Sequence, residues 1–139
     1  MFSAKHLVLA LVIALAGSVL LADDLSGSDS FLCSVTQVTS CPLDEPCVTG
    51  SPWKENVPSF LVVDLKSKTL ATTPASGLNR QSPIQHLERD NGLIILQGHE
   101  LGRAFSFTIS ESTGLMTGAV ALDGEAVVGF GACTPSPVN

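Results

Sequence analysis

Aromatic residues of the kind that stack on sugars are scarce in this sequence. It contains no tyrosine, one tryptophan and six phenylalanines, and aromatic residues make up 5% of the chain. A carbohydrate-binding cleft lined with rings is therefore not indicated. The carboxylates that could form the catalytic pair of a glycosidase have no spacing that sets the separation the reaction needs. These carboxylates are Asp44, Glu45, Glu55 and Asp64.

Basic residues are also few. The chain has 7 lysines and arginines against 13 aspartates and glutamates, which gives a net charge of −6. A surface of this sign repels phosphate backbones and anionic lipid headgroups, and no local basic cluster compensates for it. The composition argues against a nucleic-acid partner and against adhesion to membranes. It favours the approach of a basic protein, although negative charge is also a common route to solubility.

Motifs for catalysis are missing. Beyond residue 22 the only histidines are His86 and His99, no serine lies in a G-x-S-x-G motif, and no C-x-x-C is present. Nucleophilic catalysis needs a base beside its serine, threonine or cysteine, and dithiol redox chemistry needs a close cysteine pair. We expect no catalytic residues, no cofactor and no enzymatic activity.

One metal site can be drawn from the sequence. His86 and Glu88 are two residues apart, so on a strand they share a face, and His99 and Glu100 follow in the next hairpin. Two imidazoles and a carboxylate would suit zinc. The alternative, which we prefer, is that these are surface histidines beside charged neighbours, with no metal bound.

Four cysteines lie beyond residue 22, at spacings of 8, 6 and 86. These spacings are not those of zinc knuckles, and an even count favours two disulfides, for which three pairings exist. We prefer Cys41–Cys47, because the prolines of "CPLDEPC" bend the chain back, together with Cys33–Cys133. The second bridge would close a loop of about 100 residues, worth about 4–5 kcal/mol in the chain-entropy model.

The first 22 residues have the layout of a secretory signal peptide. Lys5 precedes an apolar run from Leu7 to Leu21, and Ala22 is followed by two aspartates. The run is short for a spanning helix, so we expect no stable membrane insertion after cleavage, and export to the periplasm or secretion. Cleavage after Ala22 is preferred. Cleavage after Ala16 and an uncleaved anchor are the alternatives.

The rest of the chain is typical of a single all-β domain. We expect a flexible segment at 23–30, the domain at 31–134 and a tail at 135–139. Asn91-Gly92 and Asp123-Gly124 are strong turn signals between apolar runs, and "RAFSFTIS" alternates apolar and polar residues. The expected strands are 31–41, two in 59–73, 84–88, 93–98, 103–110, 115–122 and 125–133, whereas 42–58 and 74–83 are expected to be loops.

The predicted fold is a single small antiparallel meander, either a barrel or a strongly curled sheet, stapled by disulfides. The pairing around Gly114 stays open. A four-residue loop would place Phe105 and Phe107 on the face of Met116 and Gly118, and a bulge would instead pair them with the opposite face. Both faces of the last two strands are largely apolar, which a barrel interior or a second covering layer would explain.

Several segments together resemble a known group of proteins. The combination of "GLIILQG", "GRAFSFTI", "TGLMTGAVA" and "GFGACT" is similar to a group of small exported bacterial proteins of uncharacterised activity. The similarity spans residues 31–134 and implies export and a β-meander, with no activity or site residue. Size, disulfides and β character also resemble small periplasmic barrels that inhibit lysozymes, as a likeness of fold alone.

The loop "CPLDEPCVTGSPWKENVP" is the best candidate for a functional site. A Cys41–Cys47 bridge and the prolines would stiffen it, so it would lose little freedom on docking. Asp44 and Glu45 could meet a basic cleft, and Trp53 could anchor the contact. Under the alternative, which we prefer for this residue, Trp53 caps an open end of the barrel and the bridge only staples the chain.

We therefore expect a non-catalytic exported module that binds or inhibits a protein partner, and an envelope protein is the candidate partner. One alternative is a carrier that holds a small apolar ligand inside the barrel, where interior glycines would make room and buried phenylalanines would not. Others are an envelope-structural protein and a metal-dependent enzyme. The sequence does not specify an oligomeric state.

Overall fold

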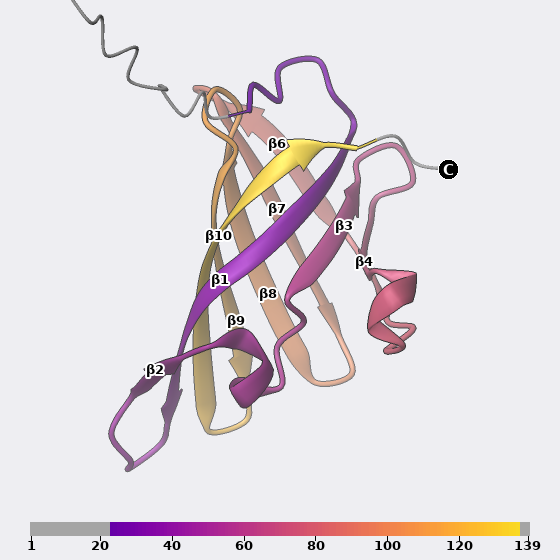
Figure 1. Cartoon of the computed structure of the whole chain (residues 1–139). Coiled ribbons are helices and arrows are strands. Elements are labelled where there is room, and N and C mark those ends of the chain that lie inside the picture. Colours follow the sequence, from indigo (N-terminus) through magenta and orange to yellow (C-terminus); the bar gives the residue numbers. More distant parts are fainter. Residues whose placement is uncertain (1–22, 137–139) are drawn as a thin grey trace, which may run out of the picture.

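The structure is a computed structural model that describes residues 23–136, so the predicted signal peptide and the end of the predicted tail lie outside the described residues. Ten strands and two short 3₁₀ helices follow one another along the chain (Figure 1). They are β1 (Ser30–Pro42), β2 (Val48–Gly50), η1 (Pro52–Glu55), β3 (Phe60–Asp64), β4 (Thr69–Thr72), η2 (Pro74–Ser76), β5 (Gln81–Pro83), β6 (His86–Asp90), β7 (Leu93–Glu100), β8 (Arg103–Ser110), β9 (Leu115–Leu122) and β10 (Glu125–Pro135).

The strands form one strongly curled antiparallel sheet, which confirms the predicted fold class. Their order is β5-β4-β3-β1-β10-β9-β8-β7-β6, and β2 pairs with β1 outside this path. The two strands at the ends of the order, β5 and β6, are joined by Ile84 and Gln85 alone. The Ile84 amide donates to Lys68 beside β4, and the Gln85 amide donates to Gln97 on β7. The same short segment therefore touches both ends of the sheet.

The register around Gly114 follows the first of the two predicted alternatives. Phe105 lies opposite Val120, and Phe107 lies opposite Gly118. These side chains point into the curl, where they join a core that includes the fully buried Phe31, Ile94 and Leu96.

Two inward glycines make room for two phenylalanine rings. Gly118 faces Phe107 across the β8–β9 pair, and Gly98 faces Phe105 across the β7–β8 pair. A Cβ at Gly98 would lie 2.6 Å from the Phe105 ring, and one at Gly118 would overlap the Phe107 ring. The two rings are 5.8 Å apart and tilted by 60°. The interior glycines thus accommodate side chains of the protein's own core.

Two segments expected to be loops contain regular structure. The 74–83 segment ends in β5, and the 42–58 segment contains β2 and η1. Each new strand has three residues, too few to show alternation, and tertiary pairing with a longer neighbour forms them. The strand expected at 84–88 is β6 and runs from His86 to Asp90.

Leu25 anchors the segment that we expected to be flexible. Its side chain is fully buried, and its backbone N–H donates to Glu111 at 2.7 Å. Arg89 reinforces the contact, because its guanidinium donates to the Ser28 carbonyl at 2.7 Å and lies 3.3 Å from the Glu111 carboxylate. A lone leucine among small and acidic residues has no periodicity, so the sequence carried no signal for this anchor.

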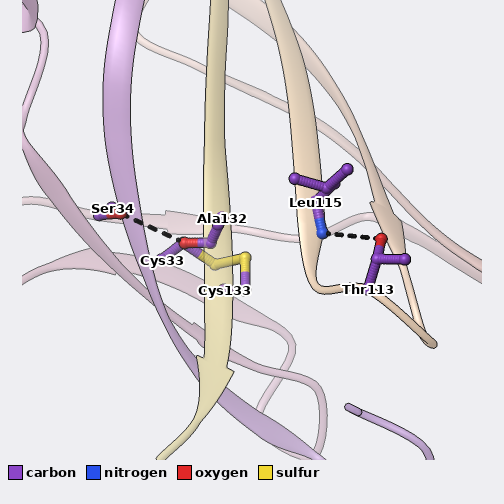
Figure 2. The surroundings of a disulfide bond; sticks show 6 residues. All are labelled: Cys33, Ser34, Thr113, Leu115, Ala132 and Cys133. Carbon is purple, nitrogen blue, oxygen red and sulfur yellow. Dashed lines mark hydrogen bonds between the residues drawn. A yellow bond between two sulfur atoms is a disulfide. The ribbon is translucent and has the colours of Figure 1, made fainter. Parts of the chain in front are cut away.

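The Cys33–Cys133 bridge joins β1 to β10 in the middle of the sheet (Figure 2). The two cysteines are directly opposite each other, and their exposed fractions are 0% and 4%. The second bridge is Cys41–Cys47, so the preferred pairing is confirmed. Two bridges with no free cysteine indicate a non-reducing, extracellular-type environment. Within residues 23–136, no helix has the length and apolar character needed to cross a membrane.

Candidate functional site

The end of β1 and β2 form a hairpin that projects beyond the neighbouring turns (lower left of Figure 1). Its loop, residues 41–47, is closed by the Cys41–Cys47 bridge, and we call this loop the stapled tip. Three residue pairs, from Val38–Gly50 to Ser40–Val48, hold β2 against β1. The tip is therefore fixed both by a covalent link and by a short ladder.

Contacts with the turn between β9 and β10 hold the base of the stapled tip. The Leu43 backbone N–H donates to the Gly124 carbonyl at 2.7 Å. Below it, the buried Ser40 hydroxyl donates to the Glu125 carboxylate at 2.6 Å. A charge-assisted bond of this kind is among the stronger hydrogen bonds. The tip thus has a defined position relative to the sheet.

The outer part of the stapled tip is acidic and apolar. Asp44 and Glu45 are exposed, and Asp44 has a left-handed backbone with a φ of 62°. Leu43 and Val48 beside them are 72% and 55% exposed. Two carboxylates and two aliphatic side chains therefore face solvent on a braced protrusion.

Trp53 lies on η1, next to the hairpin in the chain, and is 69% exposed. The interpretation in which it caps an open end of the barrel is wrong. Its neighbour Pro52 is the buried residue of this short helix, and Val57 packs against the core. Because Pro52 and Val57 hold the segment down, Trp53 is left to project into solvent.

Two further exposed leucines occur at the same end of the sheet. The antiparallel register places residues 42–59, 73–80, 101–102 and 123–124 at this end, which we call the loop end. Leu78 and Leu101 there are 45% and 87% exposed. Sequence reasoning did not single them out, although a leucine in a two-residue turn before glycine was a visible signal.

The Leu101 backbone is strained. Leu101 and Gly102 have φ values of 48° and 76°, almost the same as the 49° and 77° of Asn91 and Gly92 in the turn at the opposite end. Asparagine suits this left-handed conformation, whereas leucine does not. Leu101 is therefore both strained and exposed, and neither feature helps the fold. Such outliers are grounds for a functional hypothesis.

The residues of the hypothetical metal site do not come together. His86 contacts Glu88 at 3.3 Å, but both are more than half exposed. Glu100 is on the opposite face of β7 from His99 and accepts a hydrogen bond from Ser82 at 2.5 Å. Within residues 23–136, no group of three or more histidines, cysteines or carboxylates is placed to hold a metal ion.

Asp44, Glu45 and Trp53 line neither of two hollows on the surface of the described residues. One, of about 560 Å³, lies at the end opposite the loop end, beside Asp29, Asp64 and Lys66. There the Ser67 backbone N–H, and also that of Lys66, donates to the Asp64 carboxylate and lowers its pKa. The other hollow, of about 320 Å³, is on the outer face beside Leu32 and Phe60. The stapled tip is therefore a protrusion that belongs to neither hollow.

No protein-family model, curated protein or solved structure matches this chain. The resemblance to small exported bacterial proteins and to lysozyme-inhibiting barrels therefore stays a prediction. What the residues do must be argued from their geometry.

Proposed function

We propose that this protein is an exported, non-catalytic module that binds a protein partner of the cell envelope through its loop end. The contact residues are Asp44 and Glu45 on the stapled tip and Trp53 beside it. The observation that carries the proposal is the exposure of Trp53, at 69%, on a segment braced by the fully buried Pro52. A large aromatic side chain on a stiff support is the kind of residue that anchors protein contacts.

Rigidity supports the proposal. Closing residues 41–47 by a disulfide reduces the conformations that the tip must give up on docking. The carboxylates of Asp44 and Glu45 would raise the rate of encounter with a basic site on the partner. A protein with a cleft rimmed by lysines or arginines and holding an apolar socket fits this surface.

Export and a periplasmic or secreted location are part of the proposal. The two disulfides support an oxidising compartment, and the apolar run before residue 22 supports passage across a membrane. The carrier alternative has no observation in its favour, because the rings of Phe105 and Phe107 occupy the space beside the inward glycines.

The proposal is tested by affinity capture from an envelope extract with three forms of the purified protein. They are the wild type, the triple variant Asp44→Ala/Glu45→Ala/Trp53→Ala, and the control Glu88→Ala/Asp90→Ala/Leu93→Ala. The control removes the same charge and one large apolar side chain from exposed positions of β6 and β7. We expect a partner that the wild type and the control retain and the triple variant loses, with weaker capture at high salt. Equal capture by the triple variant would reject the proposal.

Leu101→Asn is expected to change stability and binding in opposite directions. Asparagine relieves the left-handed strain, so the free energy of unfolding should rise by a few tenths to about 1 kcal/mol. Loss of an apolar contact should weaken capture of the same partner. Chemical denaturation measures the change in the free energy of unfolding, and the capture assay measures the change in binding. A variant that is less stable, or one that is more stable and captures the partner equally well, would remove Leu101 from the binding surface.

A further inference from the structure

The outward side chains of β8, β9, β10 and β1 carry no charge, and we call the surface that they form the neutral face. Asp23 borders it at the hollow beside Leu32 and Ala132. In the described residues 23–136, the charged residues of these four strands are Arg103 and Glu125, at the first positions of β8 and β10. Both occupy inward-facing positions of their strands, and the Glu125 carboxylate accepts a hydrogen bond from the buried Ser40 hydroxyl. On the neutral face, Leu115 is 62% exposed and Phe130 is 43% exposed.

This composition is unusual for a sheet surface in contact with water. The solvated face of an antiparallel sheet normally carries polar and charged residues. The double apolar character of β9 and β10 suggested a barrel interior or a second covering layer. The curl of the sheet buries the inward apolar residues of β9 and β10, but it does not account for the apolar residues on their outward faces. In the described part of the chain no element packs over the middle of the outward face, where Ala119 and Ala121 are exposed.

Large and small residues are separated on the neutral face. Toward the end opposite the loop end, Leu115 lies beside Ala132, and Ala132 lies beside Ser34 on β1 (Figure 2). Phe130 lies one outward row nearer the loop end. At the loop end itself, Ala126, Ala121 and Ala104 form a row across β10, β9 and β8. The neutral face therefore has bulky side chains, Leu115 and Phe130, toward one end and a flat row of alanine methyl groups at the other.

We infer that a second copy of this chain covers the neutral face in a two-fold symmetric dimer. Its axis lies in the plane of contact and crosses the strands, so that Leu115 of each copy rests on the alanine row of the other, and Phe130 rests on the next row, which contains Ala119 and Val128. A face with a ridge at one end and a flat field at the other is complementary to itself under this rotation. Each copy carries a net charge of −6, and the copies repel least where they meet without charges.

The area of the neutral face sets the affinity that we expect for the dimer. Four strands about 4.8 Å apart, each about six residues long, cover about 400 Å² per copy. This places the contact at the small end of specific interfaces, where association is weak. We expect a monomer–dimer equilibrium in the micromolar range. Raising the salt concentration should strengthen the dimer, because salt screens the repulsion between two acidic copies.

Sedimentation velocity over a wide range of protein concentration tests the dimer. Leu115→Glu and, as a second variant, Phe130→Glu should each weaken dimerisation by about a hundredfold, because a two-fold contact contains every substitution twice. The matched control Leu101→Glu, at the loop end, should leave the dimer unchanged. Ala121→Trp should also abolish it, whereas Ala121→Ser should not. Intact mass and an unchanged unfolding midpoint confirm that each variant is folded and has both bridges.

Two results would overturn the inference. One is a wild-type protein that stays monomeric at every concentration. The other is a dimer that Leu101→Glu dissociates and Leu115→Glu does not, which would place the contact at the loop end. The inference is independent of the proposed function, because Leu115→Glu and Phe130→Glu change the neutral face and leave the loop end, where the proposed contact residues lie, unchanged.

Discussion

Replacing Cys33 and Cys133 together with alanine is expected to lower the free energy of unfolding by about 4–5 kcal/mol. The bridge closes a separation of 100 residues, so its loss frees almost the whole unfolded chain. It also joins β1 to β10, neighbouring strands in the middle of the strand order. The alanine side chains leave the bridge's buried position partly empty, which adds to the loss.

Urea denaturation of the purified double variant measures this loss. The matched control is Cys41→Ser/Cys47→Ser, whose bridge spans a separation of 6 and should contribute about 2 kcal/mol. A loss for the Cys33/Cys133 variant no larger than that of the control would contradict the assignment of the two bridges.

Gly118→Ala is expected to have opposite effects in two backgrounds. In the wild type, the new methyl group meets the Phe107 ring and should destabilise the protein by about 1–3 kcal/mol. Phe107→Ala alone should cost about 3–5 kcal/mol, because Phe107 is only 8% exposed. Once the ring is gone, Gly118→Ala should stabilise by about 0.5–1 kcal/mol, since alanine loses less backbone entropy than glycine in a strand.

A double-mutant cycle built from the four unfolding free energies measures the coupling between Gly118 and Phe107. The expected coupling is large and favours the double variant. An effect of Gly118→Ala with the same sign and size in both backgrounds would show that the ring and the glycine do not share the space assigned to them.

Much of the fold could be predicted because local chemistry specifies it. Asn91-Gly92 formed the predicted tight turn, since both residues tolerate a left-handed backbone. The alternation of Phe105 and Phe107 with polar residues identified their strand and its buried face. The spacing of prolines and cysteines was enough to choose the Cys41–Cys47 pairing.

Other features depend on contacts that no short pattern encodes. Leu25 is buried because it packs into the core at the end of the sheet. The three-residue strand β5 forms because it pairs with β4. The register across Gly114 could not be chosen from the sequence, because both faces of β9 and β10 are apolar. Only the curl distinguishes the inside from the outside.

The candidate site was predicted in part. Asp44, Glu45 and the stapling bridge followed from composition and spacing, and the structure places both carboxylates in solvent. The role preferred for Trp53 was wrong, because a lone tryptophan in a small domain is commonly a core residue and Pro52 takes the buried position here. Leu101 was missed, although its place before Gly102 in a two-residue turn was a signal in the sequence, and its left-handed backbone is established by the structure.

The Cys41–Cys47 bridge stiffens the stapled tip and has its main effect there rather than on the curled sheet. Hydrogen exchange of the Cys41→Ser/Cys47→Ser variant, followed by mass spectrometry, tests this most directly. We predict that residues 41–58 lose the most protection, whereas β7 to β10 lose no more than the roughly 30-fold that follows from a global destabilisation of about 2 kcal/mol. A larger loss of protection throughout β1 and β10, or no change in the tip, would contradict this account.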